Sequence, residues 1–191
     1  AIGPDALAIQ NFTSATDAYN IAIGFQSGVA VTTGVQNILI GGLSGDAITT
    51  GEKNVAIGHN AFSANTTGAG NTTVGAYSLD ANTTADDNTA MGQSALGANT
   101  TGADNVAVGR SALTASTTAD KNVAVGKHAM LNTTTGGSNV AIGDGALDAN
   151  TTGTVNVAVG RDALGSSTTQ SANTAIGYGA LRDNTSGTSN V

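Results

Sequence analysis

The apolar and polar positions of this chain repeat every 17 residues. Each unit opens on an asparagine and continues with a β-branched residue, in most units an alanine, a larger apolar residue and a glycine, as in Asn54-Val-Ala-Ile-Gly58. This alternation predicts a short β-strand in which Val55 and Ile57 face the interior, while Asn54, Ala56 and Gly58 lie on the other face. The units begin at Asn20, Asn37, Asn54, Asn71, Asn88, Asn105, Asn122, Asn139, Asn156, Asn173 and Asn190.

A second apolar position in most units predicts a second strand. It is occupied by a large side chain, followed two residues later in most units by alanine and then by a threonine pair; its members include Phe62, Leu96, Leu113, Met130, Leu147, Leu164 and Leu181. Glycines such as Gly68 and Gly102 are expected to close the turn. A helical repeat is disfavoured, because glycine, asparagine and threonine recur in nearly every unit.

Two strands and two turns in 17 residues predict one coil of a parallel β-solenoid. We therefore expect an all-β domain of ten coils over residues 20–191, roughly 48 Å long at about 4.8 Å per coil. Residues 1–19 are expected to form an irregular first coil, since Gly3 and Gly24 are 21 residues apart and about four residues are inserted near Asn11 to Asp17. The chain starts and stops inside repeats, which predicts a fragment of a longer fibrous protein.

The composition and the net charge exclude several classes of binding partner and site. Only 10% of the residues are charged and the net charge is −7, so neither nucleic acid nor an anionic membrane surface is an expected partner. No apolar run is long enough to span a bilayer, and we expect no membrane contact by this fragment. The absence of cysteine excludes disulfides and thiolate metal sites.

The alanine of the first strand suggests an oligomer. If it faces outward, a row of small side chains lets a second backbone pack closely, which favours a homo-oligomer about a long axis. The interface candidates are Ala56, Ala90, Ala107, Ala124, Ala141, Ala158 and Ala175. The alternative is that alanine simply fills a narrow roll.

The strand sequences NVAIG and NTAIG, followed by GxxAL and NTTG segments, resemble the head repeats of trimeric autotransporter adhesins, the YadA-like head. They resemble still more the NTAIG and NTTG repeats of phage tail fibres. The resemblance covers about Asn20 to Val191, with a unit longer than that of the adhesin heads. It implies a homotrimer of left-handed β-rolls outside the cell, either on a bacterial surface, with its outer-membrane anchor elsewhere in the chain, or in a virion tail fibre.

The sequence shows no catalytic constellation. It lacks a GxSxG elbow, a P-loop and a zinc signature, and the only histidines, His59 and His128, are four coils apart at different positions of the unit. We expect no enzyme activity, no metal and no cofactor. A hexapeptide-type acyltransferase remains an alternative that needs a histidine at a subunit cleft.

Residues that vary between units follow the glycine of the first strand. These mixed polar and aromatic side chains are candidates for binding a host-surface protein or glycan: His59, Asn60, Tyr77, Arg110, Lys127, His128, Arg161 and Tyr178. A second alternative is ice binding by outward Asn-x-Thr rows, which contain Asn65, Asn82, Asn99 and Asn150.

Overall fold

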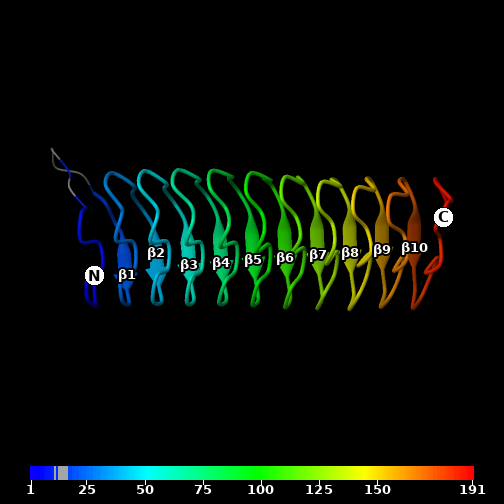
Figure 1. The fold of residues 1–191 in the computed structure, drawn as a ribbon, viewed down its shortest axis with the longest axis horizontal. Helices are drawn as coiled ribbons and strands as arrows, with labels where there is room; N and C mark the ends of the chain where they lie inside the picture. The colour runs from blue at the N-terminus through cyan, green and yellow to red at the C-terminus, as the bar shows by residue number, and fades with distance from the viewer. Residues whose placement is uncertain (11, 13–16) are drawn as a thin grey trace.

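The computed structural model describes residues 1–10, 12 and 17–191 and forms a parallel β-solenoid, drawn as a rod in Figure 1. Within these residues it has ten strands of three residues each, in one sheet and in chain order. The strands are β1 (Ile21–Ile23), β2 (Ile38–Ile40), β3 (Val55–Ile57), β4 (Thr72–Val74), β5 (Thr89–Met91), β6 (Val106–Val108), β7 (Val123–Val125), β8 (Val140–Ile142), β9 (Val157–Val159) and β10 (Thr174–Ile176). The predicted all-β solenoid with a 17-residue coil is confirmed, while the insertion predicted near Asn11 to Asp17 falls mostly outside the described residues.

Neighbouring coils are joined by backbone hydrogen bonds both inside and outside the strands. Val55 pairs with Thr72 and Ile57 with Val74, so every partner lies 17 residues away. In the turns, the Thr66 N–H donates to the Thr83 carbonyl at 2.9 Å. The stack is therefore held around much of each coil and not only along the sheet.

The side chains of the first strand point the other way from the prediction. Ala56 and Ala107 are fully buried inside the coil, whereas Val55 and Ile57 are half-buried on the outside, and Met91 is 43% exposed. The prediction that positions like Val55 and Ile57 fill the interior is wrong. The coil is narrow and already holds a large side chain from the following segment, so it accommodates only a small one from the strand.

The predicted second strand is also wrong, because the segment after the glycine is a series of tight turns. In one coil, the Ala95 N–H donates to the Gly92 carbonyl at 3.2 Å and the Asn99 N–H to the Leu96 carbonyl at 3.1 Å. Leu96 has φ of 53°, in the left-handed region that no strand contains. This conformation costs roughly 1–2 kcal/mol, which burial of the leucine side chain, worth about 1.5–3 kcal/mol, offsets.

The large side chain after these turns forms the main row of the core. Its fully buried members include Phe62, Leu79, Leu96, Leu113, Met130, Leu147 and Leu164. The predicted row is confirmed except at Leu181, which is 37% exposed. Two coils fill the same space differently, with Gly28 and Gly45 in this row. A Cβ at Gly45 would lie 2.8 Å from both Leu39 Cδ2 and Ile48 Cδ1, so two larger neighbours occupy the volume that the missing side chain leaves.

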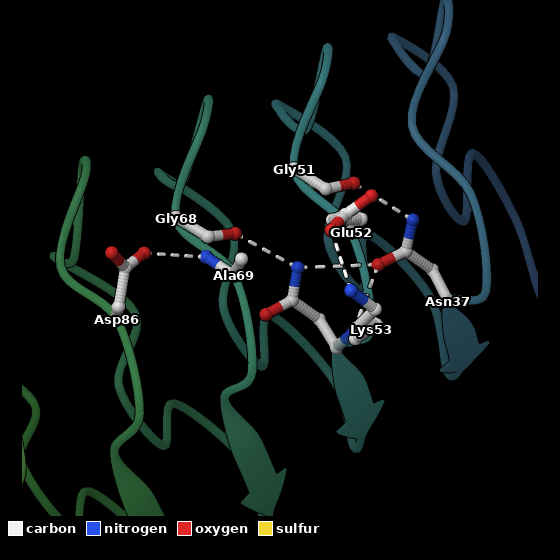
Figure 2. Close-up of polar contacts among 8 residues, drawn as sticks. Asn37, Gly51, Glu52, Lys53, Gly68, Ala69 and Asp86 are labelled. Carbon is white, nitrogen blue, oxygen red and sulfur yellow. Dashed lines mark hydrogen bonds and ion pairs between the residues drawn. The ribbon is translucent and has the colours of Figure 1, made fainter.

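The recurrent asparagine builds a second buried row. The Asn54 N–H donates to the Asn37 Oδ1 at 3.0 Å, and its side-chain amide donates to the Gly68 carbonyl at 2.9 Å. The Asn37 amide makes the equivalent bond to Gly51 at 2.9 Å, as Figure 2 shows. Each asparagine thus satisfies backbone groups that would cost about 1–3 kcal/mol if left unpaired. This explains why every unit opens on asparagine.

The part of the chain that the structure describes contains no helix long and apolar enough to cross a membrane.

Candidate functional site

A glycine directly follows each strand, and the two residues after this glycine form a row along the rod, which we call the turn edge. All eight predicted receptor-binding residues lie on it. Tyr77 is 40% exposed and Tyr178 75%. His59, Arg110, Lys127 and Arg161 are exposed, while Asn60 and His128 are half-buried. Their receptor role stays a prediction.

The backbone of the turn edge is fixed by the coil stack. The Tyr77 N–H donates to the His59 carbonyl at 3.0 Å, and the His128 N–H donates to the Arg110 carbonyl at 3.1 Å. Both donors have positive φ, 57° at Tyr77 and 60° at His128. The second residue of each turn is therefore held by the preceding coil, and variation along this edge changes side chains without changing the backbone.

Side chains of the turn edge also contact each other between neighbouring coils. The rings of His59 and Tyr77 meet edge to face, with centroids 5.6 Å apart. The Arg110 Nη2 lies 3.4 Å from the His128 Nε2, and the Arg161 guanidinium lies 5.8 Å from the centre of the Tyr178 ring. Three separate pairs thus extend side-chain contacts along the rod axis.

Charge is distributed unevenly between the turns. Three of the six lysines and arginines of the chain, Arg110, Lys127 and Arg161, lie on the turn edge, where two carboxylates, Asp144 and Asp162, leave a formal charge of +1. The Arg161 Nε lies 3.5 Å from the Asp162 Oδ2. The turn edge is therefore weakly cationic on a chain whose net charge is −7.

The turn that precedes the asparagine is acidic instead. It carries five carboxylates and two lysines, a formal charge of −3: Glu52, Lys53, Asp86, Asp87, Asp104, Asp120 and Lys121. Two of the carboxylates have structural partners, because Asp86 accepts the Ala69 N–H and Asp120 accepts the Ala103 N–H, both at 2.7 Å. Figure 2 shows the Asp86 contact beside the ion pair of Lys53 with Glu52 at 2.8 Å.

The outward side chains of the strands form a second candidate surface, the apolar sheet face. Strand pairing in register places them in two parallel rows across the ten strands. Its apolar members are Ile21, Ile23, Ile38, Ile40, Val55, Ile57, Val74, Met91, Val106, Val108, Val123, Val125, Val140, Ile142, Val157, Val159 and Ile176. Most of these side chains are half-buried, and five are exposed: Ile21, Ile23, Met91, Ile142 and Ile176. An apolar surface of this extent is typical of an interaction site.

The alanines predicted at the oligomer interface do not reach this surface. Each is at most 2% exposed within the single chain: Ala56, Ala90, Ala107, Ala124, Ala141, Ala158 and Ala175. The prediction that they face a sister chain is wrong for the reason given above, that small residues are needed inside the narrow coil. The alternative, alanine as filling, describes the structure.

The prediction that Asn-x-Thr rows face outward is wrong for the asparagines. Asn65, Asn82, Asn99 and Asn150 are fully buried. The first threonine of each pair is tied to the next coil, as where the Thr100 Oγ1 donates to the Thr117 carbonyl at 2.9 Å. The second threonine is exposed in every pair from Thr33 to Thr169, whereas the first is exposed only at Thr83 and Thr168. A single continuous row therefore remains, and not the flat array that the ice-binding alternative requires.

Within the described ranges, 1–10, 12 and 17–191, no pocket is found, and no group of three or more histidine, aspartate or glutamate side chains is placed to hold a metal ion. The structure does not bring His59 and His128 together. Each instead contacts a neighbour from an adjacent coil.

Three aspartates on the turns beside the core row have perturbed acidities. Burial raises the pKa of Asp46, of Asp80 and of Asp148 above the usual value, against backbone hydrogen bonds that lower it. At Asp148 the charge of Asp162 adds to the increase and that of Arg182 opposes it. The folded state therefore binds protons at these sites more tightly than the unfolded chain does.

We predict that Asp148→Asn raises the free energy of unfolding at pH 7. The folded-state pKa is raised, so the ionised carboxylate opposes folding above that pKa, and this penalty is lost as the pH falls toward the unfolded value of 3.8. The gain is small, because the side chain is only half-buried. Urea unfolding at pH 7 and pH 3.5 measures it, with exposed Asp104→Asn as the control. A gain that is equal at both pH values would contradict the prediction.

One feature of these surfaces escaped sequence reasoning. The outward orientation of the valines and isoleucines was hidden because a period of two assigns two faces without saying which is inside. The signal that could have resolved it was Asn54 and its equivalents, since an amide in every unit on the alanine face is typical of a buried ladder.

Comparisons of the chain with protein-family models, with curated proteins and with solved structures find no match.

Proposed function

We propose that this chain is a non-enzymatic fibrous attachment module, outside the cell on a bacterial surface or in a virion tail fibre. The observation that carries the proposal is the contrast between a uniform coil and a variable turn edge. Backbone, core and asparagine rows repeat from coil to coil, while residues 59, 77, 110, 127, 161 and 178 change in size, charge and aromatic character. A receptor, protein or glycan, binds where the variation lies.

The solenoid supplies reach and stiffness. Coil-to-coil bonds run through the turns as well as the strands, as at Thr66 and Thr83, and the parallel sheet is continuous from β1 to β10. A force that shears neighbouring coils past each other is therefore shared by many backbone hydrogen bonds at once. A rod of this kind holds its binding residues at fixed separations.

We further propose that the module is a homotrimer that packs through the apolar sheet face. Support comes from the outward valines and isoleucines, which are half-buried or exposed and on a soluble single chain would remain partly in contact with water. The sheet face is straight along the rod in Figure 1, which suits parallel packing of identical chains about a long axis. The number three rests on the resemblance to adhesin heads and tail-fibre repeats.

Attachment is tested with fluorescent beads coated with the protein. We expect them to adhere to at least one surface in a panel of intact bacteria, animal epithelial cells and extracellular matrix. Tyr77→Ala, Arg110→Ala and Tyr178→Ala combined are expected to lower adhesion about tenfold or more, because large exposed aromatic and arginine side chains dominate binding energy.

The matched control replaces exposed threonines away from the turn edge, Thr84→Ala, Thr101→Ala and Thr118→Ala, and should leave adhesion within about twofold of the unmodified protein. Absence of adhesion on every surface, or equal adhesion of the triple turn-edge variant, would refute the attachment role of this edge.

A further inference from the structure

We infer that the turn edge from Arg110 to Tyr178 binds a linear acidic polysaccharide, with its carboxylate or sulfate groups paired to the cations and a sugar ring stacked on Tyr178. The inference rests on the proposed attachment function and names the class of receptor. The ligand would contact the half of the turn edge that carries the cations Arg110, Lys127 and Arg161.

The cations are spaced along the rod and not clustered. Arg110, Lys127 and Arg161 occupy the same position of three coils out of four, so they span about 14 Å at about 4.8 Å per coil. All three are exposed. A ligand that meets them all must be extended along the rod and must carry its negative charges at intervals. Arginine suits carboxylate and sulfate groups, because its planar donors can bind two oxygens at once.

Two of the cations already have neighbours that leave room for an anion. The Arg110 Nη2 is 3.4 Å from the His128 Nε2, a long contact that occupies one of the several guanidinium donors. The Arg161 Nε lies 3.5 Å from Asp162, beyond an ideal hydrogen bond. Both arginine side chains are exposed, so donors remain for an anion.

Tyr178 adds an apolar surface at one end of this row. Its ring is 75% exposed, and the Arg161 guanidinium lies 5.8 Å from the ring centre. The C–H face of a pyranose ring packs on an aromatic ring of this kind. An arginine beside the ring is then within reach of an acidic substituent on the same or the next sugar.

An extended acidic peptide fits this edge less well. Peptides that add to a sheet require a strand with free backbone groups, but strands β2 to β9 are paired on both sides. The turn backbone is occupied as well, since the Ser111 N–H donates to Gln93 at 3.0 Å and the Asp162 N–H to Asp144 at 3.1 Å. Recognition here depends on side chains alone, which suits a ligand with separated rings and charges.

Nucleic acid fits less well because of charge density. Duplex DNA carries about one negative charge per 1.7 Å of axis, while this edge offers three cations over about 14 Å and interrupts them with Asp144 and Asp162. The chain as a whole is negatively charged. A polysaccharide with fewer charges per unit length avoids these carboxylates.

The test measures binding of the full chain to immobilised polygalacturonate and chondroitin sulfate by biolayer interferometry, with uncharged dextran as the reference. We expect binding to at least one acidic polymer and not to dextran. Arg110→Gln with Lys127→Gln should weaken it by roughly tenfold or more. The matched control, Lys53→Gln with Lys121→Gln, removes the same charge from the acidic turn and should change binding less than about twofold.

Stacking is tested at one residue. Tyr178→Ala is expected to weaken binding several-fold, and Tyr178→Phe should restore it, because phenylalanine retains the ring. Circular dichroism confirms that each variant keeps the fold.

Several results would overturn the inference: no binding to either acidic polymer, equal losses in the Arg110/Lys127 and Lys53/Lys121 variants, or equally tight binding to polyglutamate or to single-stranded poly(dT). Bead adhesion separates the two proposals. If beads adhere through the turn edge but acidic polysaccharides do not bind, the polysaccharide inference fails and attachment stands. If the polysaccharides bind specifically but beads adhere to no surface, the attachment proposal fails.

Discussion

Gly92→Ala is expected to lower the free energy of unfolding by roughly 2–5 kcal/mol. Gly92 directly follows strand β5 and has φ of 134°, a conformation that residues with a Cβ rarely adopt. A Cβ there would lie 2.6 Å from the Gly109 oxygen and 2.7 Å from its carbonyl carbon. Because the obstacle is the backbone of the next coil, only separation of the coils relieves the contact. Thermal and urea unfolding measure the loss, and hydrogen exchange should rise in β5 and β6.

The control for Gly92 is another glycine with the same backbone conformation and open space around it. Gly177 follows β10 with φ of 124° and has nothing within 4 Å of an added Cβ. Gly177→Ala should therefore show the backbone strain without the contact between coils, and it should cost clearly less. If Gly92→Ala unfolds like the unmodified protein, the tight coil stack described above is incorrect.

Val108→Lys with Val125→Lys is expected to convert the proposed trimer into single chains. The two residues are neighbours on the apolar sheet face, since β6 and β7 pair Val108 with Val125. In a parallel trimer the same positions of three chains meet near the axis, so six ammonium groups would be brought together in a site that excludes water. Burying unpaired charge costs several kcal/mol per group. Light scattering after size exclusion should show the mass of one 18.4 kDa chain.

A matched pair of substitutions tests whether added charge alone causes dissociation. Thr118→Lys with Thr135→Lys places two lysines on the exposed threonine row of the same two coils. This variant should keep the mass of the unmodified protein. A single-chain mass for the unmodified protein would disprove packing through the apolar sheet face. An unchanged mass for the Val108→Lys, Val125→Lys variant would show that the interface lies elsewhere.

Much of the fold could be predicted from sequence because the period is strict. A 17-residue repeat with one glycine-ended apolar segment admits few structures other than a stacked coil, and the core row from Phe62 to Leu164 followed from its constant large side chain. The inside and outside of the strand could not be assigned, because Val55 and Ala56 are both apolar. Which of them faces inward depends on the volume left by Leu79, Leu96 and their equivalents, a property of the closed coil and not of the strand.

The turns show a second limit. Leucine is typical of helices and strands, and nothing in the letters around Leu96 indicates a residue with positive φ. The stack imposes this conformation, since backbone bonds to the coils on both sides outweigh local preference. The exposure of the turn edge, in contrast, could be predicted from the sequence. Variation between units placed Arg110 and Tyr178 on one exposed row correctly, because residues that differ from coil to coil are rarely part of a common core.

The regular register of the coils has a consequence for how such a protein changes over generations. Since each ladder contact joins residues 17 apart, a whole unit can be duplicated or lost and every remaining asparagine still finds its partner. Repeated coding segments recombine readily, so the reach of the rod can lengthen or shorten in single genetic events. Each duplication would also add the two turn-edge residues of one coil, and a new side chain at these positions could then be selected.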